Sequence, residues 1–316
     1  MALSNIVPLI QEYGPLRTEI DTIGASTFYG FAFSNSTTTA NASWLIIRET
    51  VAGSATEVIY ASEFFNQVWD DRASLFANPP FENNNSVFFQ AGNERMLVGD
   101  VADLEFSKTD AFSISAWFRT NTTGQLAIAS NQGASNTDGW RLVTNTNRVD
   151  FHLSESNSDR FEMRTPAVSS ADDTWNHVVI MYDGSNADTG FNIVYNGVDQ
   201  TLSSNGSSTI TTTLDYTGVN AYVGIRNVTV NDFIGFIDEV GVWSTGLSVA
   251  EAQTVYNSGS ALDLLNSGPQ AVSLIHWWRM GDNDTFPTIA DLGTGGNNGT
   301  LENMISSAIV GEAAPI

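Results

Sequence analysis

Two adjacent carboxylates, Asp238 and Glu239, are the residues whose type best suits acid–base chemistry. Glycosidases usually use a pair of carboxylic acids that flank the glycosidic bond to be cleaved. Neighbouring residues of a strand, however, point to opposite faces, and "FIDEVGVW" reads as a strand. We therefore expect both to be structural. His177, at the start of another predicted strand, has no nucleophile beside it in sequence and is also expected to be structural.

A second group of residues suits the binding of a sugar rather than its cleavage. Trp140 follows the loop "NQGASNTDG", in which Asn136 and Asp138 supply an amide and a carboxylate. A tryptophan ring can cover the apolar face of a pyranose while such groups bind its hydroxyls. Asn231 and Asp232, in a later loop, are further carbohydrate-binding candidates. The alternative is that Trp140 opens a strand and packs inward.

The composition excludes several classes of partner and chemistry. The chain has 12 basic and 35 acidic residues, a formal net charge of −23. Such a field repels phosphate backbones and anionic lipids, so we expect no nucleic acid and no membrane partner. There are no cysteines, which excludes disulfides and thiolate chemistry. The N-terminus lacks the basic and apolar regions of a signal peptide, and we predict none.

Short strands and turns dominate the elements that must position these residues. Residues 1–20 are predicted to form one short helix, and 26–76 a small antiparallel sheet. The stretch "NPPFENNN" at 78–85 marks a domain boundary, because prolines and asparagines punctuate structure. The sequence therefore predicts a small β-rich domain over 1–80 and a second domain over 86–316.

The second domain reads as a β-sandwich. Its strands alternate in polarity: Phe112, Ile114, Ala116 and Phe118 are expected to face a core. Many short strands with turn punctuation predict an all-β sandwich of the jelly-roll type. One helix interrupts the strands, where Ser248 and Glu251 form a capping box; Gly259 is expected to end it.

Four segments in order resemble laminin-G-like, concanavalin A-like jelly-roll domains of the lectin and glucanase superfamily. They are the opening strands through "SISAWF", then "TWNHVVIMYDGS", "FNIVYNGV" and "FIGFIDEVGVWSTGLSVAEAQ". The resemblance covers 86–259 and implies a domain that binds carbohydrate or protein. Glucanases of this fold place carboxylates as Glu-x-x-x-Glu or Glu-x-Asp-x-x-Glu on one strand. That spacing does not occur in this sequence, so we expect no enzyme.

The resemblance raises the question of whether this domain binds Ca²⁺. The pentraxin-like branch of the superfamily binds Ca²⁺ in an acidic loop before the closing strand. Here "GIRNVTVNDFIG" lacks that cluster of carboxylates. A structural Ca²⁺ near Asp238, Asp291 and Asn298 is the alternative, because such oxygen ligands suit a hard cation.

The N-terminal domain is similar to a small module of tailed-bacteriophage virion proteins. The likeness runs from "DTIGASTFYGFAF" to "FFNQVWDDRASLFA". It implies a fibre or decoration protein of the virion, assembled in the host cytoplasm. Its partners would be other virion proteins and a host-surface polysaccharide, and we favour a homotrimer because repeated weak sites gain avidity. A bacterial adhesin is the alternative, and a glycoside hydrolase of the same fold is a further one.

The C-terminal segment "LIHWWRMGD…NNGTLENM" has an unusual position. In laminin-G-like domains a similar segment precedes the core, whereas here it follows the helix. First and last strands of the fold are neighbours, so a circular permutation requires only a short new link. We predict that Leu274–Trp278 pairs with 239–244, that Trp277 or Trp278 enters the core, and that 274–304 completes the sheet. A truncated second jelly roll is the competing interpretation.

Overall fold

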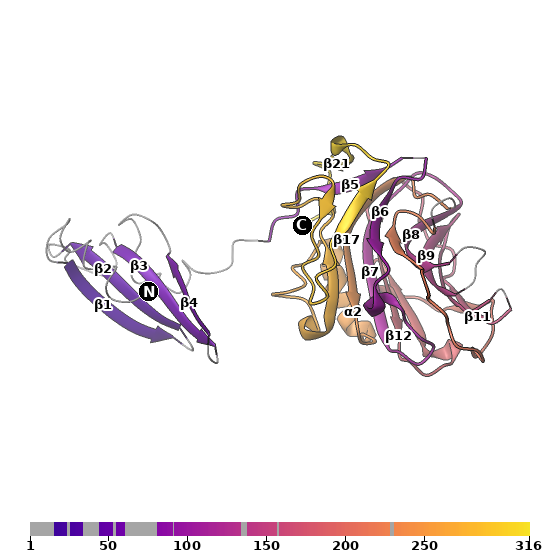
Figure 1. Cartoon of the computed structure of the whole chain (residues 1–316), viewed down its shortest axis with the longest axis horizontal. Coiled ribbons are helices and arrows are strands. Elements are labelled where there is room, and N and C mark those ends of the chain that lie inside the picture. Colours follow the sequence, from indigo (N-terminus) through magenta and orange to yellow (C-terminus); the bar gives the residue numbers. More distant parts are fainter. Residues whose placement is uncertain are drawn as a thin grey trace. The chain divides into compact units, whose positions relative to one another are not determined.

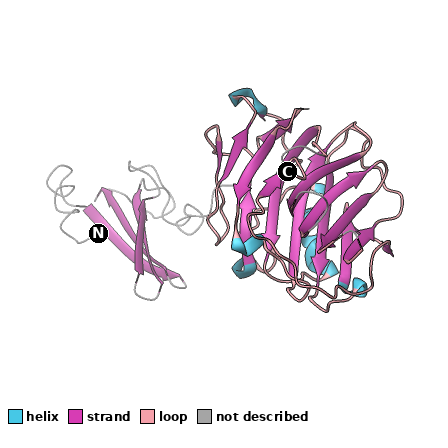
Figure 2. Ribbon diagram, turned by 45° about the vertical axis from the view of Figure 1, so that its right-hand side comes forward, coloured by secondary structure: helices cyan, strands magenta, loops and turns pink. Residues whose placement is uncertain are grey.

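The computed structural model describes residues 16–23, 26–33, 44–52, 55–60, 81–90, 92–133, 138–156, 158–227 and 231–316. The chain divides into two compact units, Met1–Pro80 and Phe81–Ile316. Among the described residues, strands dominate both units, and helix occurs in short segments of the second (Figure 2). No helix in the described ranges is long and apolar enough to cross a membrane.

The N-terminal unit contains a four-stranded antiparallel meander. Its strands follow the order β1 (Leu16–Ile23), β2 (Ser26–Phe33), β3 (Trp44–Ala52) and β4 (Ala55–Tyr60). This arrangement agrees with the antiparallel sheet predicted for 26–76, to which it adds β1. The predicted helix over 1–20 is wrong for residues 16–20, which pair with β2, while residues 1–15 lie outside the described residues.

The second unit is a sandwich of two antiparallel sheets (Figure 1). The nine-stranded sheet has the order β15 (Ser203–Ser204), β11 (Arg160–Arg164), β10 (Val149–Ser154), β9 (Gly139–Asn145), β8 (Gln125–Gln132), β16 (Ala221–Val223), β6 (Arg95–Gly99), β20 (Gly299–Glu302) and β19 (Thr288–Ile289). The eight-stranded sheet has the order β14 (Val198–Asp199), β13 (Phe191–Tyr195), β12 (Asn176–Tyr182), β7 (Phe112–Arg119), β17 (Gly235–Trp243), β5 (Ser86–Phe89) and β21 (Ile309–Val310), with β18 (Leu274–Trp278) also paired to β17. The predicted concanavalin A-like β-sandwich is confirmed.

The alternation of apolar side chains builds the core between the sheets. On β7, Phe112, Ile114, Ala116 and Phe118 are fully buried members of this core, as predicted. Each large apolar side chain moved from water into such a core contributes about 1.5–3 kcal/mol. The two sheets are therefore held together chiefly by inward-facing residues at every second position of their strands.

Strand β18 confirms the predicted pairing of the C-terminal segment. It lies antiparallel to the second half of β17, with Val240 opposite Trp278 and Trp243 opposite Leu274. The first half of β17 pairs on the same side with β5. A register shift after Asp238 separates these two halves of β17. Both Trp277 and Trp278 are buried, so the segment that follows the helix is an integral part of the sandwich.

A second apolar cluster covers the outer face of the eight-stranded sheet. Helix α2 (Val249–Tyr256) contributes Ala252 and Val255 to it, beside Trp243 and Trp277. The predicted capping box at the start of α2 is present. The helix ends before the predicted Gly259, because Asn257 takes the left-handed conformation with φ of 48°.

Candidate functional site

Trp140 is a core residue and not an exposed sugar-binding ring. It is 2% exposed and lies with Phe106 and Phe151, at ring-centroid distances of 5.9 and 6.4 Å. Its Nε1 donates to the Leu104 carbonyl at 2.7 Å. Gly139 turns the chain tightly before it: φ is +118° and a Cβ would lie 1.9 Å from a carbonyl of β8. The prediction of stacking by Trp140 is wrong, and the inward-packing alternative holds.

The other predicted carbohydrate-binding residues do not form one site. Asn136 lies outside the described residues. Asp138 directly precedes β9, and its Oδ1 accepts from the Asp215 amide at 3.2 Å. Asn231 lies at the other end of β8 and donates to the carbonyl of its first residue, while Asp232 accepts two backbone amides after β5. Eight strand residues, about 25 Å, separate the two groups.

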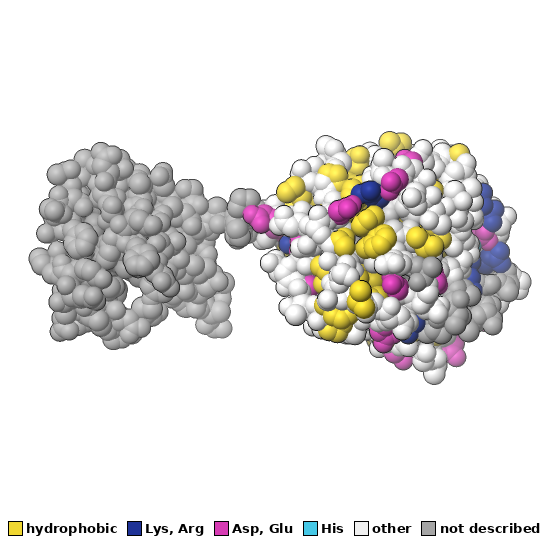
Figure 3. Space-filling model, turned by 90° about the horizontal axis from the view of Figure 1, so that it is seen from above, with side chains coloured by type: hydrophobic (Ala, Val, Ile, Leu, Met, Phe, Trp, Pro, Cys, Tyr) yellow, Lys and Arg dark blue, Asp and Glu magenta, His cyan; other side chains and the backbone are white. Residues whose placement is uncertain are grey.

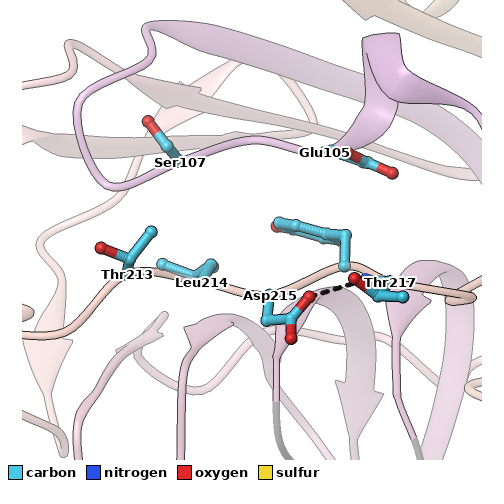
Figure 4. Close-up of a pocket in the computed structure, with 7 residues that line it drawn as sticks. Glu105, Ser107, Thr213, Leu214, Asp215 and Thr217 are labelled. Atoms are coloured by element: carbon cyan, nitrogen blue, oxygen red, sulfur yellow. Dashed lines mark hydrogen bonds between the residues drawn. The ribbon is translucent and has the colours of Figure 1, made fainter.

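An open cavity of about 510 Å³ lies beside Asp138. Figure 4 shows the loop with Glu105 and Ser107 facing the segment 213–217 across it. Asp215 accepts from the Thr217 amide at 3.0 Å, and Tyr216 donates inward to the Phe106 carbonyl. Burial, and then the neighbouring Asp100, raise the pKa of Glu105. The cavity offers carboxylates and hydroxyls, but its one aromatic side chain faces the core.

A more developed group of polar side chains lies on the outer face of the nine-stranded sheet. On β10, Val149, Phe151 and Leu153 belong to the inner core, and on β11 so do Phe161 and Met163. The residues between them therefore point outward. We name this outer cluster the polar face; it comprises Gln132, Arg141, Arg148, Asp150, His152, Ser154, Arg160, Glu162, Arg164 and Arg226.

The centre of the polar face is buried although it lies outside the core. Asp150, His152 and Ser154 are 1%, 2% and 0% exposed. The segment after β16 covers part of the sheet, because the Ser130 hydroxyl donates to the carbonyls of Ile225 and Arg226, at 2.8 and 2.7 Å. Basic side chains gather at the margin of the unit in Figure 3, on the side where Figure 1 places β11.

Ion pairs neutralise both carboxylates of the polar face. Glu162 accepts from Arg160 at 2.6 Å and also pairs with Arg164. Burial raises the pKa of Glu162, but hydrogen bonds from Arg160 and Arg164 outweigh it and bring the pKa to about 2. Asp150 pairs with Arg148 at 3.0 Å. Five arginines thus accompany two carboxylates, a local charge of +3 in a chain of −23.

The contact between Arg141 and His152 fixes the protonation of the imidazole. The guanidinium NH2 lies 3.1 Å from Nδ1 of His152. A guanidinium can only donate, so Nδ1 accepts and the ring proton lies on Nε2. Burial, and then the charge of Arg141, hold the pKa of His152 well below its usual range. His152 is therefore neutral, and its Nε2–H points away from Arg141 as a donor.

Several buried donors of the polar face have no hydrogen-bond acceptor within the described part of the chain. They are Nε2 of His152, Nε2 of Gln132 and Nε of Arg226. The Gln132 amide is oriented by Arg141, whose NH1 donates to Oε1 at 2.6 Å, so its NH2 group faces elsewhere. The hydroxyl of Ser154 is likewise without a partner there. Buried polar groups are normally paired, so this concentration indicates a place for a ligand or ordered water.

A metal ion does not fit this cluster. Asp150, His152 and Glu162 place one ligand atom each within 4.8 Å of one another. However, Nδ1 of His152 is occupied by the Arg141 donor, and both carboxylates are paired with arginines. A cation would have to displace these guanidinium groups and would face their charge.

The residues predicted for calcium also do not form a common cage. The Asp291 carboxylate accepts four N–H donors, from the backbone of Trp277, Gly293 and Asn297 and from the His276 ring. Oδ1 of Asn298 accepts from the Asp291 amide. Asp238 has a separate set of partners, the Asn83 amide and the Ala314 backbone N–H. The oxygens that would hold Ca²⁺ are thus engaged in internal hydrogen bonds.

Asp238 and Glu239 do not point to opposite faces as predicted. Ile237, Val240 and Val242 face the inner core, whereas both carboxylates lie outside it. Glu239 has a positive φ of 48°, and the bulge at this point adds one residue to the strand. Burial raises the pKa of both, to about 7 for Glu239. Both are buried in structural contacts, which agrees with the predicted structural role.

His177 is likewise enclosed by protein. It is 1% exposed and lies against the rings of Trp117 and Tyr256, at 4.8 and 5.8 Å. Burial lowers the pKa of its imidazole to about 3.

The sequence contained a signal for the polar face that residue-by-residue reasoning missed. Charged or polar residues occupy every second position of "RVDFHLS" and "RFEMR". That pattern is usual for a solvent-facing strand surface and did not single out a site. Its distinguishing property is the concentration of arginine, since five of the nine basic residues in 81–316 lie here.

The family match in the comparisons with known proteins lies within the second unit. Residues 91–253, more than half of the chain, match the concanavalin A-like lectin/glucanases superfamily. The structure is similar to a candidate carbohydrate binding protein from Bacteroides ovatus, at 16% identity and a TM-score of 0.49, covering 100% of this chain and 87% of that one. The CBM40 of the Ruminococcus gnavus IT-sialidase has 20% identity and a TM-score of 0.44, covering 54% and 95%. A Limulus polyphemus SAP-like pentraxin has 13% identity and a TM-score of 0.39, covering 55% and 82%. No curated protein matches the sequence.

Proposed function

Because the chain belongs to the concanavalin A-like lectin/glucanases superfamily, we propose that its 81–316 unit binds carbohydrate at the polar face and does not cleave it. The observation that carries this proposal is the set of buried donors on His152, Gln132 and Arg226 without acceptors in the described residues. A buried donor left unpaired costs about 1–3 kcal/mol. A ligand rich in oxygen acceptors would recover that cost, and a glycan is such a ligand.

The state of the carboxylates supports binding over hydrolysis. A glycosidase needs one carboxylic acid that stays protonated until it protonates the leaving group. The pKa of Glu162 is held at about 2 by its arginines, so it is ionised at neutral pH. Burial raises the pKa of Asp150, and this carboxyl is engaged by Arg148 and Asn145. Asp238 and Glu239, whose pKa values are raised, each accept hydrogen bonds from neighbouring groups of the chain, Asn83 and Ala314 for Asp238 and Trp277 and Arg279 for Glu239.

For the whole chain, the proposed role is that of a bacteriophage virion protein of the fibre or decoration type. The N-terminal unit would attach to other virion proteins, and the jelly roll would bind a host-surface polysaccharide. The support is the resemblance of residues 20–80 to a virion module. A symmetric trimer would multiply a weak glycan affinity. A bacterial carbohydrate-binding adhesin with the same jelly roll is the second candidate.

A glycan array followed by hydrogen-exchange mapping tests the binding site. The purified full chain should bind at least one host-surface polysaccharide, and the bound glycan should slow amide exchange in 139–164. Protection confined to 102–110 and 213–217 would move the site to the cavity of Figure 4. No binding to any glycan would refute carbohydrate recognition. Antibody labelling of purified virions tests the location, which absence from the particles would refute.

A further inference from the structure

We infer that the polar face recognises the oxyanion of an acidic sugar, with the guanidinium groups of Arg141 and Arg226 on either side of it. The inference rests on the proposed function and narrows its ligand from glycans in general to glycans that carry a carboxylate or a sulfate ester. Three independent properties of the polar face support it: its charge, the chemistry of its unpaired atoms, and the proximity of two guanidinium groups.

The charge of the polar face is opposite to that of the chain. Its five arginines exceed its two carboxylates by three charges, whereas the whole chain carries −23. The negative field of the whole chain repels acidic ligands at long range. A preference for an acidic glycan therefore cannot come from non-specific attraction, and it would have to come from this local excess of arginine.

The unpaired atoms of the polar face are mostly donors. His152, Gln132 and Arg226 each present an N–H that finds no acceptor among the described residues, and Ser154 adds one hydroxyl. A sugar hydroxyl brings a donor of its own for every oxygen. A carboxylate or sulfate only accepts, and it has several lone pairs for such donors. The donor excess thus matches an oxyanion better than a neutral sugar.

Arg226 lies near Arg141, because Ser130 donates to the Arg226 carbonyl at 2.7 Å and is directly opposite Arg141 in the pairing of β8 with β9. Arg141 is 6% exposed, and its pKa is lowered to about 10 by burial and then by the charge of Arg226. Arg141 donates to Gln132 at 2.6 Å and to His152 at 3.1 Å. Arg226 forms no ion pair with any acid in the described residues of 81–316. An anion placed between the two side chains would relieve their repulsion and form charge-assisted hydrogen bonds.

The donor groups lie across three neighbouring strands, with Gln132 on β8, Arg141 on β9 and His152 and Ser154 on β10, and the segment of Arg226 lies against β8. Ser130, whose hydroxyl donates to the Arg226 carbonyl, lies directly opposite Arg141 in the pairing of β8 with β9. Arg141 in turn lies opposite His152 in the pairing of β9 with β10. One oxyanion and the sugar ring that carries it can therefore reach these groups together.

Matched ligands provide the decisive test. Isothermal titration of the full chain would compare an oligogalacturonate and sialyllactose with their carboxyl-reduced forms, which keep the ring and lose the charge. Dextran sulfate and inorganic phosphate complete the set. We expect carboxyl reduction to weaken binding about 10- to 100-fold, since a hydrogen bond to a charged group contributes about 1.5–3 kcal/mol. A preference for dextran sulfate over both acids would instead identify a sulfate ester as the oxyanion.

Arg226 is the informative residue for mutation, because it has no hydrogen bond or ion pair whose loss would unfold the described domain. Arg226→Gln should weaken the acidic ligand about 10- to 100-fold and leave the melting temperature unchanged, and Arg226→Lys should recover part of the loss. Arg119→Gln, which makes the same change of charge on the other sheet, is the control and should bind as the wild type does.

The outcomes separate this inference from the proposed function. Equal affinity for acidic and carboxyl-reduced ligands would refute the oxyanion and leave glycan binding intact. Unchanged binding by Arg226→Gln would refute the assignment of the anion to this arginine pair. If inorganic phosphate competes with the acidic sugar when both are at the same concentration, the site binds anions without recognising the sugar. Failure of every saccharide to bind, charged or neutral, would refute the proposed function itself.

Discussion

The ion pair between Arg279 and Glu239 gives the most quantitative prediction for this fold. The two side chains are 11% and 4% exposed, with Nε of Arg279 3.1 Å from the Glu239 carboxylate. Trp277 donates its Nε1 to the other oxygen of Glu239 at 2.6 Å. Arg279 also lies over the Phe81 ring at 4.5 Å and pairs with Asp282 at 2.7 Å. Substitution Arg279→Gln would leave Glu239 buried without its counter-charge.

The size of the destabilisation by Arg279→Gln depends on whether the Glu239 carboxyl is protonated. Loss of one partner from a buried ion pair costs about 3–5 kcal/mol when the remaining group stays charged. A proton on Glu239 removes the charge and most of that cost. The lost contacts of Arg279 with Asp282 and Phe81 contribute about 1–2 kcal/mol at any pH. We therefore expect destabilisation of about 1–2 kcal/mol at pH 5.5 and about 3–5 kcal/mol at pH 8.5.

The sign of the pH dependence is set by the direction of the pKa shift. Burial, opposed by Arg279 and Trp277, raises the pKa of Glu239 from 4.5 to about 7, so the folded chain holds a proton that the unfolded chain has released. The stabilisation that comes from the proton on Glu239 is complete below pH 4.5, the pKa of this carboxyl in the unfolded chain. It is lost as the pH rises to about 7, the pKa in the folded chain. Without Arg279 the pKa moves higher, and the loss continues above pH 7 at up to about 1.4 kcal/mol per pH unit.

Urea denaturation at several pH values, followed by tryptophan fluorescence, measures this effect. Six of the eight tryptophans lie in 81–316 and report on this unit. Arg119→Gln is the control, because its partners Asp173 and Glu312 are more than half exposed and the pairs should contribute less than about 1 kcal/mol. If the free energy of unfolding of Arg279→Gln differs from that of the wild type by the same amount from pH 5.5 to 8.5, the reasoning is refuted. It is also refuted if the further substitution Glu239→Gln restores less than half of the lost free energy at pH 8.5.

Three further predictions follow from the core and the C-terminal segment. Trp140→Ala should destabilise the jelly roll by about 3–5 kcal/mol in urea denaturation, and a cost under 1 kcal/mol would contradict its core position. Deletion of 270–316 should abolish cooperative unfolding by removing β18, and a truncated chain that still melts cooperatively would disprove the permuted arrangement. Chelation with EDTA should leave the melting temperature unchanged, since the oxygens of Asp291 and Asn298 are engaged internally; a fall of several degrees would establish a structural Ca²⁺.

Local patterns in the sequence were sufficient to predict much of the sandwich. The alternation along Phe112–Arg119 places the same residues in the core that it predicted, because a half-buried strand must alternate. The capping box at Ser248 is a local interaction and forms as its spacing indicates. The pairing of Leu274–Trp278 with β17 was predicted from the order of the segments, by comparison with domains in which a similar segment precedes the core.

The candidate site was not predictable by the same means, because it depends on contacts between distant segments. Trp140 opens a strand, and only the packing of Phe106 against it decides that its ring faces inward. The bulge at Glu239 arises where β17 changes partner from β5 to β18, which no local spacing encodes. The outward residues of β10 are contacted by side chains of the neighbouring strands, with Arg141 against His152 and Arg164 near Asp150, and these contacts join segments distant in sequence.

The first residues of the 81–316 unit, 81–84, lie on the other side of this unit from the polar face. Phe81 packs on the outer face of the eight-stranded sheet, and the Asn83 side chain donates to Asp238 there at 2.8 Å. The backbone amide of Asn84 is held by the Asp282 carboxylate, so the first residues of this unit are fixed in position. The polar face lies on the outer face of the other sheet, across a core about 10 Å thick. Figure 1 places the segment before β5 and strand β11 at opposite sides of the unit. A glycan bound at the proposed site would therefore lie on the opposite side of this unit from residues 81–84.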